Sequence, residues 1–139
     1  MTPSIIIQLD QLTPYFQPGD VLTGTYRFVD ISPEEVQRME FSILWYTEGK
    51  GDEDLGVHHF ESVARDTDER FADFLQEFEQ SPTFQFAVKL PTSPLSYYGK
   101  ILKIHWCVRV RLYLRSGREI SSERIFQFGN LPPLEVSLN

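Results

Sequence analysis

Residues 101–115 read ILKIHWCVRVRLYLR and form the clearest alternation of apolar and polar side chains in the chain. Every second residue from Leu102 to Leu114 is large and apolar, whereas the positions between them are mostly polar or charged. Because successive side chains of a strand point to opposite faces, this pattern predicts a β-strand with one face in the core. At ~3.3 Å per residue the strand would span roughly 45 to 50 Å, which predicts a central place in its sheet.

The burial of seven apolar side chains would stabilise this strand by roughly 1.5 to 3 kcal/mol for each side chain. A slip of one residue would bury three arginines, so the pattern also fixes the register. Ser116-Gly117 predicts a tight turn, after which residues 118–128 return as an antiparallel partner. Glu119 and Glu123 are then expected to face the arginines across the ladder.

On the N-terminal side of this strand, short segments rich in β-branched and aromatic residues and separated by Pro and Gly predict further strands at 4–10, 21–29, 39–48, 55–64 and 84–90. The first of these is expected at a sheet edge, paired with a late strand. Pro18-Gly19-Asp20 predicts a turn, and Ser32 is placed to cap one helical turn. Residues 49–54 read as a solvated hairpin tip.

The acidic segment 65–80 interrupts this β pattern. Its apolar residues Phe71, Phe74, Leu75 and Phe78 have the three-and-four spacing of one helical face. We therefore expect one short helix near residues 68–80, lying over an open sheet edge.

The spacing of the strands indicates an antiparallel, immunoglobulin-like β-sandwich, and two blocks make the prediction more specific. Residues 15–26 read YFQPGDVLTGTY and residues 84–91 read FQFAVKLP, followed by Pro94, Ser96-Tyr97, Gly99 and the long strand. In order and separation, these blocks resemble two signatures of the arrestin family over roughly residues 5–128. The resemblance implies an all-β sandwich of the arrestin type.

Arrestins and the related retromer subunit carry two such sandwiches in tandem. We expect residues 1–139 to form one such domain, with 131–139 as a tail or linker-like segment. The resemblance carries over no receptor-binding, clathrin-binding or ubiquitin-ligase-binding motif, so it implies no functional residue.

Charge and cysteine content narrow the function classes. The net charge of −7 argues against nucleic-acid binding, which needs clustered cations. Residues 1–80 hold 17 acidic against 5 basic residues and residues 81–139 hold 3 against 8, so we expect early and late strands to pair their charges. The lone Cys107 and the lack of a leader-like or membrane-spanning stretch indicate a cytoplasmic chain.

The sequence gives no catalytic, cofactor-binding or metal-binding residue. Adjacent strand residues point to opposite faces, so His58 and His59 are not expected to share a metal. Cys107 and His105, two apart on a strand, would stand ~6.5 to 7 Å apart, beyond direct hydrogen-bond reach. We therefore expect no enzyme, with these residues in structural or surface roles.

The polar face of the long strand is the one candidate binding site. Lys103, Arg109, Arg111 and Arg115 would bind an anionic peptide or an acidic protein surface, unless they only pair with Glu119, Glu123 and other acids. Tyr97 and Tyr98 lie in the loop before the strand, and loops 91–100 and 49–54 with an exposed sheet edge are further expected contact surfaces.

These features indicate a protein-interaction or adaptor module whose protein partner the sequence does not identify. Homodimerisation through edge strands is an additional hypothesis, since a second copy could replace a missing lobe. The alternative is a sandwich that binds a small ligand such as a carbohydrate, with Tyr97, Tyr98 or Tyr113 as stacking platforms.

Overall fold

The structure is a computed structural model that describes residues 2–11, 15–49, 53–99 and 102–129. Its strands are β1 (Ser4–Leu9), β2 (Tyr15–Phe16), β3 (Val21–Val29), β4 (Val36–Gly49), β5 (Leu55–Ala64), β6 (Thr83–Lys89), β7 (Tyr97–Tyr98), β8 (Leu102–Leu114) and β9 (Glu119–Phe128). A 3-10 turn, η1 (Pro33–Glu35), precedes β4, and one helix, α1 (Arg70–Gln80), lies between β5 and β6.

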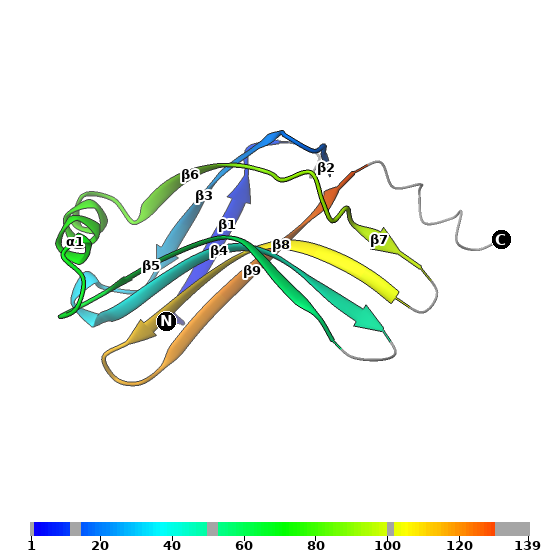
Figure 1. The fold of residues 1–139 in the computed structure, drawn as a ribbon. Coiled ribbons are helices and arrows are strands. Elements are labelled where there is room, and N and C mark those ends of the chain that lie inside the picture. Colours follow the sequence, from blue (N-terminus) through cyan, green and yellow to red (C-terminus); the bar gives the residue numbers. More distant parts are fainter. Residues whose placement is uncertain (1, 12–14, 50–52, 100–101, 130–139) are drawn as a thin grey trace.

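The strands form two layers that enclose a continuous apolar core (Figure 1). The smaller sheet has the order β1-β3-β6, and the larger one has the order β2-β9-β8-β4-β5 with β7 attached to β8. Apart from the parallel pair β2–β9, neighbouring strands run antiparallel. The expected all-β sandwich with one short helix is thus what the chain forms.

β8 is the middle strand of the larger sheet, as the alternation predicts. Its inward side chains from Trp106 to Leu114 are buried, each at most 6% exposed. The count of seven buried residues was wrong, because Leu102 is 37% exposed and Ile104 is only partly covered where β8 runs beyond the core. Five inward side chains of β8 therefore contribute fully to the core.

The β8–β9 hairpin closes as the sequence predicts, with Gly117 at a φ of 92° that an L-residue rarely adopts.

The pairing of β1 differs from the prediction. It is an edge strand, but its ladder partner is β3, the next long strand along the chain, with Ile5 opposite Phe28. The short connection to β3 through residues 10–20 makes this local pairing accessible.

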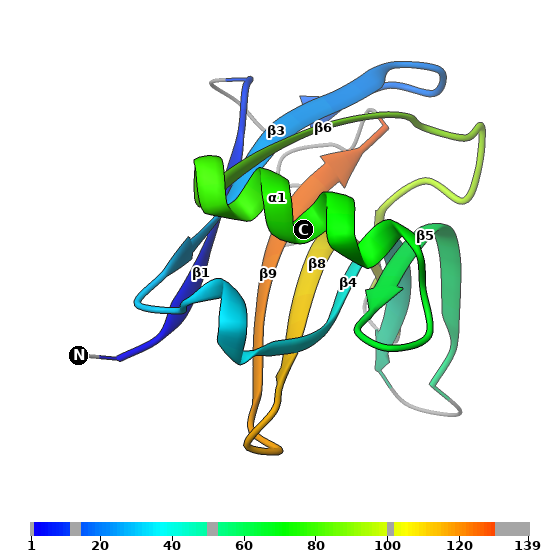
Figure 2. The ribbon, with the colours of Figure 1, turned by 90° about the vertical axis from the view of Figure 1, so that its left-hand side faces the viewer.

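The segment 65–80 contains the expected helix. Phe71, Phe74 and Phe78 of α1 are buried, and Leu75 packs at the core margin. Phe74 lies with its ring centroid 5.3 Å from that of Phe84. Figure 2 shows α1 crossing one end of the two layers, so it closes an end of the sandwich as well as contacting the edge strand β5.

Candidate interaction face

The larger sheet carries an apolar row on its outer face, the face turned away from the smaller sheet. Val57 of β5 lies opposite Leu44 of β4, Leu44 opposite Cys107 of β8, and Cys107 opposite Ile125 of β9. We call these four residues the apolar row. Its two inner members are 0–2% exposed, whereas Val57 is 52% and Ile125 47% exposed.

The thiol in this row is shielded from water. Burial, and to a lesser extent the charge of Glu123, raises the pKa of Cys107 to about 12, while Arg109 opposes the shift. The thiol is therefore protonated at neutral pH, which makes it an inert packing group and not a nucleophile. The expectation that Cys107 has a structural role agrees with this environment.

A charged rim borders the apolar row on the side toward the β8–β9 turn. Arg109 donates to Glu123 at 2.5 Å, Arg111 lies 3.7 Å from Glu119, and Arg38 approaches Glu40 at 3.3 Å. Tyr113 lies under the guanidinium of Arg38, 4.4 Å from it. Both glutamates of β9 thus occupy the places that the alternation predicts.

The four basic residues proposed as one site are spread along the strand. Lys103 and Arg115 are twelve residues apart, so ~40 Å of extended chain separates them. Arg109 and Arg111 share the outer face but each faces a glutamate, and Lys103 lies opposite Tyr98 and Glu48. The binding role of these residues remains a prediction, and the geometry does not gather them into one pocket.

The expected pairing between the acidic first part and the basic second part of the chain holds for the strands, since β4 lies beside β8, but not for the arginine ion pairs. Within the described residues, each arginine ion pair joins residues of the same part, as with Arg109–Glu123 and Arg70–Asp68. His105 contacts Glu48 at 3.0 Å, and Glu40 and Glu48 of β4 lie opposite Arg111 and Lys103 of β8. Arg109 and Arg111 nevertheless take their closest carboxylates from the hairpin partner β9.

An aromatic group lies at the other end of the outer face. The ring of His105 lies between those of Tyr46 and Tyr98, at centroid distances of 5.2 and 5.6 Å. Burial raises the pKa of both tyrosines. Tyr97 is 52% exposed. Tyr98 lies opposite Lys103 of β8, and Tyr113 follows Lys103 by ten residues, so the tyrosines proposed for stacking do not form one platform.

The loop before β8 is fastened to the core at two points. Trp106 Nε1 donates to the carbonyl oxygen of Pro94 at 2.7 Å, and Phe128 N donates to Ser96 Oγ at 2.9 Å. Leu95 and Tyr97 remain exposed between these anchors. The middle of the expected 49–54 tip and Lys100 lie outside the described residues, as does the 131–139 segment.

A β-bulge at Ile43/Leu44 changes the geometry of the two adjacent histidines. Ile43 pairs with His59 and Leu44 with Val57, so His58 is the extra residue. His58 contacts the Trp106 ring and bonds the Lys89 carbonyl, while His59 contacts the Phe41 ring. Both rings therefore turn toward the core side, contrary to the strict alternation that we assumed.

This shared side does not create a metal site. Nε2 of His58 lies 2.7 Å from the Lys89 carbonyl oxygen, and Nε2 of His59 lies 2.7 Å from Glu61 Oε2. Over the ranges that the structure describes, no three His, Cys, Asp or Glu side chains are grouped to hold a metal ion.

The sequence analysis missed the exposed apolar side of β5. Leu55, Val57 and Phe60 are each 52–55% exposed and share the outer face with the apolar row. Strict alternation would place Phe60 on the other face of the strand from Leu55 and Val57, so the sequence does not predict that the three side chains share a face. The bulge restores the common side, and the signal in the sequence is the pair of histidines that interrupts the alternation.

Comparison with known proteins identifies the fold and not the family. No protein-family model matches the chain, and no curated protein matches it in sequence. Spo0M, a sporulation control protein from Bacillus subtilis with an arrestin-like fold, superposes with a TM-score of 0.59 at 12% identity. The match covers 93% of this chain and 50% of that structure, so the chain spans half its length. The arrestin-type sandwich is confirmed as a fold.

Two further matches correct the expectation that the chain is not an enzyme. A superoxide reductase (neelaredoxin) from Ignicoccus hospitalis gives a TM-score of 0.49 at 11% identity, over 91% of this chain and 80% of that one. A variant of it gives 0.46 at 10% identity, over 92% and 80%. Enzymes thus occur among proteins with a similar β fold, so the fold does not exclude an activity.

No helix in the described part of the chain is long and apolar enough to span a membrane.

Proposed function

We propose that this chain is a protein-interaction module that binds a protein partner through the outer face of its larger sheet. The observation that carries the proposal is the apolar row, which continues across four strands and is exposed at both ends. Exposed apolar groups rimmed by charged side chains are typical of protein contact sites.

The arrangement of the face supports this use. Val57 and Ile125 offer apolar surface at low conformational cost, because β-branched side chains have few rotamers to lose on binding. Around them, Glu123 accepts a hydrogen bond from Arg109, and Glu119 lies 3.7 Å from Arg111, so part of the rim is ordered before a partner arrives. Such an ordered rim favours a specific partner over non-specific association.

A matched pair of substitutions tests the proposal. Ile125→Glu places a charge at the end of the apolar row, and Ile6→Glu makes the same change on β1 of the other sheet, where Ile6 is 38% exposed. Tagged wild type and both variants are purified with bound proteins from the cells that express the chain. We expect Ile125→Glu to lose the bound partner at least tenfold and Ile6→Glu to retain it.

The melting temperatures of both variants must stay within a few degrees of wild type, because both side chains lie at the surface. Equal recovery of the same partners by wild type and by Ile125→Glu would refute the outer face as the binding surface.

A further inference from the structure

β5 forms one edge of the larger sheet, and no further strand pairs with it in the part of the chain that the structure describes. Among the described strands its only ladder partner is β4, and Leu55, Val57 and Phe60 expose their side chains on the outer face. It contains no Lys and no Pro, two residues that commonly block edge pairing, but the bulge at His58 interrupts its regular backbone. The regular part of the edge that can accept another strand is therefore centred on Phe60.

The direction of its backbone groups follows from two hydrogen bonds. Arg65 N donates to the Gln37 carbonyl, so odd-numbered residues near this end of β5 turn their backbone groups toward β4. The carbonyl of Ser62 points the other way, because Arg70 Nη2 donates to it at 2.8 Å. By the same alternation, the N–H and C=O of Phe60 face the open edge.

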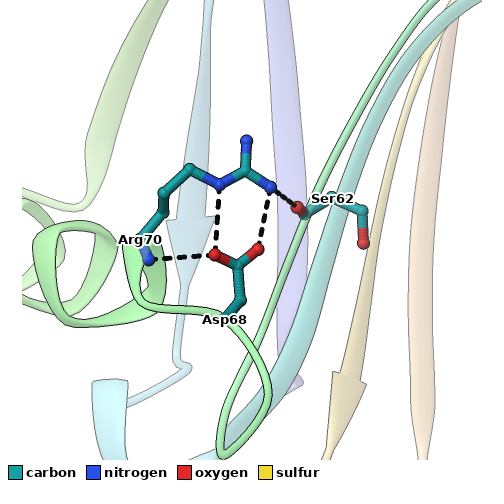
Figure 3. A network of polar contacts seen from close by, with 3 residues as sticks. All are labelled: Ser62, Asp68 and Arg70. Atoms are coloured by element: carbon teal, nitrogen blue, oxygen red, sulfur yellow. Dashed lines mark hydrogen bonds and ion pairs between the residues drawn. The ribbon is translucent and has the colours of Figure 1, made fainter.

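Figure 3 shows that the guanidinium of Arg70 is already hydrogen-bonded to the backbone at one end of this edge. Asp68 accepts from Arg70 Nε at 3.1 Å and from Nη2 at 2.8 Å, which orients the guanidinium toward the Ser62 carbonyl. Arg70 thus donates the hydrogen bond that the N–H of an added strand would donate to the Ser62 carbonyl. Because Arg70 belongs to α1, the accessible edge ends at Ser62. At the other end, Leu55 N donates to Asp54 Oδ1 at 3.1 Å, so the part of the described edge without a further ladder partner runs from Val57 to Phe60.

The charge around β5 indicates which strand would fit. Residues 53–80 contain nine acidic residues against Arg65 and Arg70, a net charge of −7 that equals the charge of the whole chain. Both arginines are engaged internally, since Arg65 donates to the carbonyls of Val36 and Pro33. A second copy of β5 would bring the same negative charge, which disfavours self-pairing.

The two sides of the edge differ in character. Glu61 lies on the core side of β5, opposite the buried Phe41. Burial raises the pKa of the Tyr26 phenol, and the negative charges of Glu61 and of Glu77 of α1 raise it further, so both carboxylates lie on the side of Tyr26. The outer side carries Leu55, Val57 and Phe60. A strand added here meets carboxylates on one side and apolar groups on the other.

We infer that the open edge of β5 binds an extended segment of a partner protein in which basic and apolar residues alternate. This rests on the proposed function and names the chemistry of its partner. Main-chain hydrogen bonds to Phe60 and its neighbours hold the segment, apolar side chains extend the apolar row, and lysines or arginines face Glu61 and Glu77.

Three synthetic probes test the inference on the full chain. The first is an acetylated, amidated nonapeptide of alternating lysine and valine, the second is the same peptide N-methylated on alternate amides, and the third replaces lysine by glutamate. We expect the first to bind in calorimetry with an affinity that falls as salt rises. The other two should bind at least tenfold more weakly, because they lack strand donors or the matching charge.

Two variants locate the site. Phe60→Pro removes an N–H that faces the open edge and should abolish binding of the lysine–valine peptide. Should this variant fail to fold, the double variant Glu61→Lys/Glu77→Lys replaces it and should weaken binding at least tenfold. Its control, Asp10→Lys/Glu34→Lys, has the same charge change at residues outside β5 and α1 and should bind as wild type does.

Equal binding of the methylated peptide, or no binding of the first peptide by folded wild type, would overturn the inference. Concentration-dependent dimerisation in sedimentation that Phe60→Pro abolishes would assign the edge to a second copy and would also overturn it. The outer-face proposal fails separately, through retention of partners by Ile125→Glu.

Discussion

Phe74→Ala is expected to destabilise the whole sandwich, because Phe74 joins α1 to the smaller sheet. Its side chain is 6% exposed, and its ring lies 5.3 Å from Phe84 of β6 and 6.3 Å from Phe28 of β3. An eleven-residue helix is marginal in water on its own, so packing must hold α1 in place. Removing the ring deletes the contacts of α1 with two strands of the smaller sheet.

The expected loss follows from the burial. Replacing a buried Phe by Ala lowers the free energy of unfolding by about 3 to 5 kcal/mol, including the cavity that remains. For a chain of this length each kcal/mol lowers the melting temperature by roughly 2 to 4 °C, so the variant should melt about 6 to 20 °C below wild type. Urea unfolding followed by tryptophan fluorescence measures the free energy directly.

Gln76→Ala is the control, because Gln76 is exposed on the same helix and the change should stay within about 0.5 kcal/mol. The reasoning is refuted if Phe74→Ala loses less than about 1 kcal/mol while the amides of α1 exchange freely in wild type. That result would mean that the helix is attached to the sandwich without stabilising its core.

Three further changes test other parts of the structure. Gly56→Ala should destabilise by about 1 to 3 kcal/mol in urea unfolding, because the added Cβ would lie 2.2 Å from Nε1 of Trp45, and adding Trp45→Leu should restore part of the loss. Cys107 should react with an aromatic disulfide reagent at pH 8 at least ~100-fold faster in urea than in the native state, and comparable rates would contradict its burial. Ser32 donates its hydroxyl and its backbone N–H to Glu35, which holds the pKa of that carboxyl below its usual range. The folded state then binds fewer protons, so the stabilisation is present above pH ~4.3 and is lost on acidification; the melting-temperature gap between wild type and Ser32→Ala should shrink from pH 6 to pH 3, and a constant gap would exclude this origin.

The candidate face illustrates where the sequence is sufficient and where it is not. The tight turn after β8 could be predicted from Ser116-Gly117, but the pairing of Arg109 with Glu123 depends on a three-residue loop, since a two-residue loop would place Arg109 opposite Arg124. The apolar row could not be predicted, since it joins residues from four strands and depends on the order β9-β8-β4-β5. Val57 and Phe60 reach the same side only through a bulge, which strict alternation does not foresee.

By itself, the alternation from Leu102 to Leu114 determined a long strand at the centre of a sheet, because one register buries the apolar side chains and the other buries arginines. The spacing of the other strands then indicated the sandwich. The spacing of the phenylalanines in α1 likewise determined a helix with one buried face. Only the tertiary structure decided that β1 pairs with β3 and that β5 is left as an open edge with Arg70 at its end. The physical reason is that periodicity records which face of a strand is buried, whereas strand order and edge exposure arise from contacts between segments far apart in the chain.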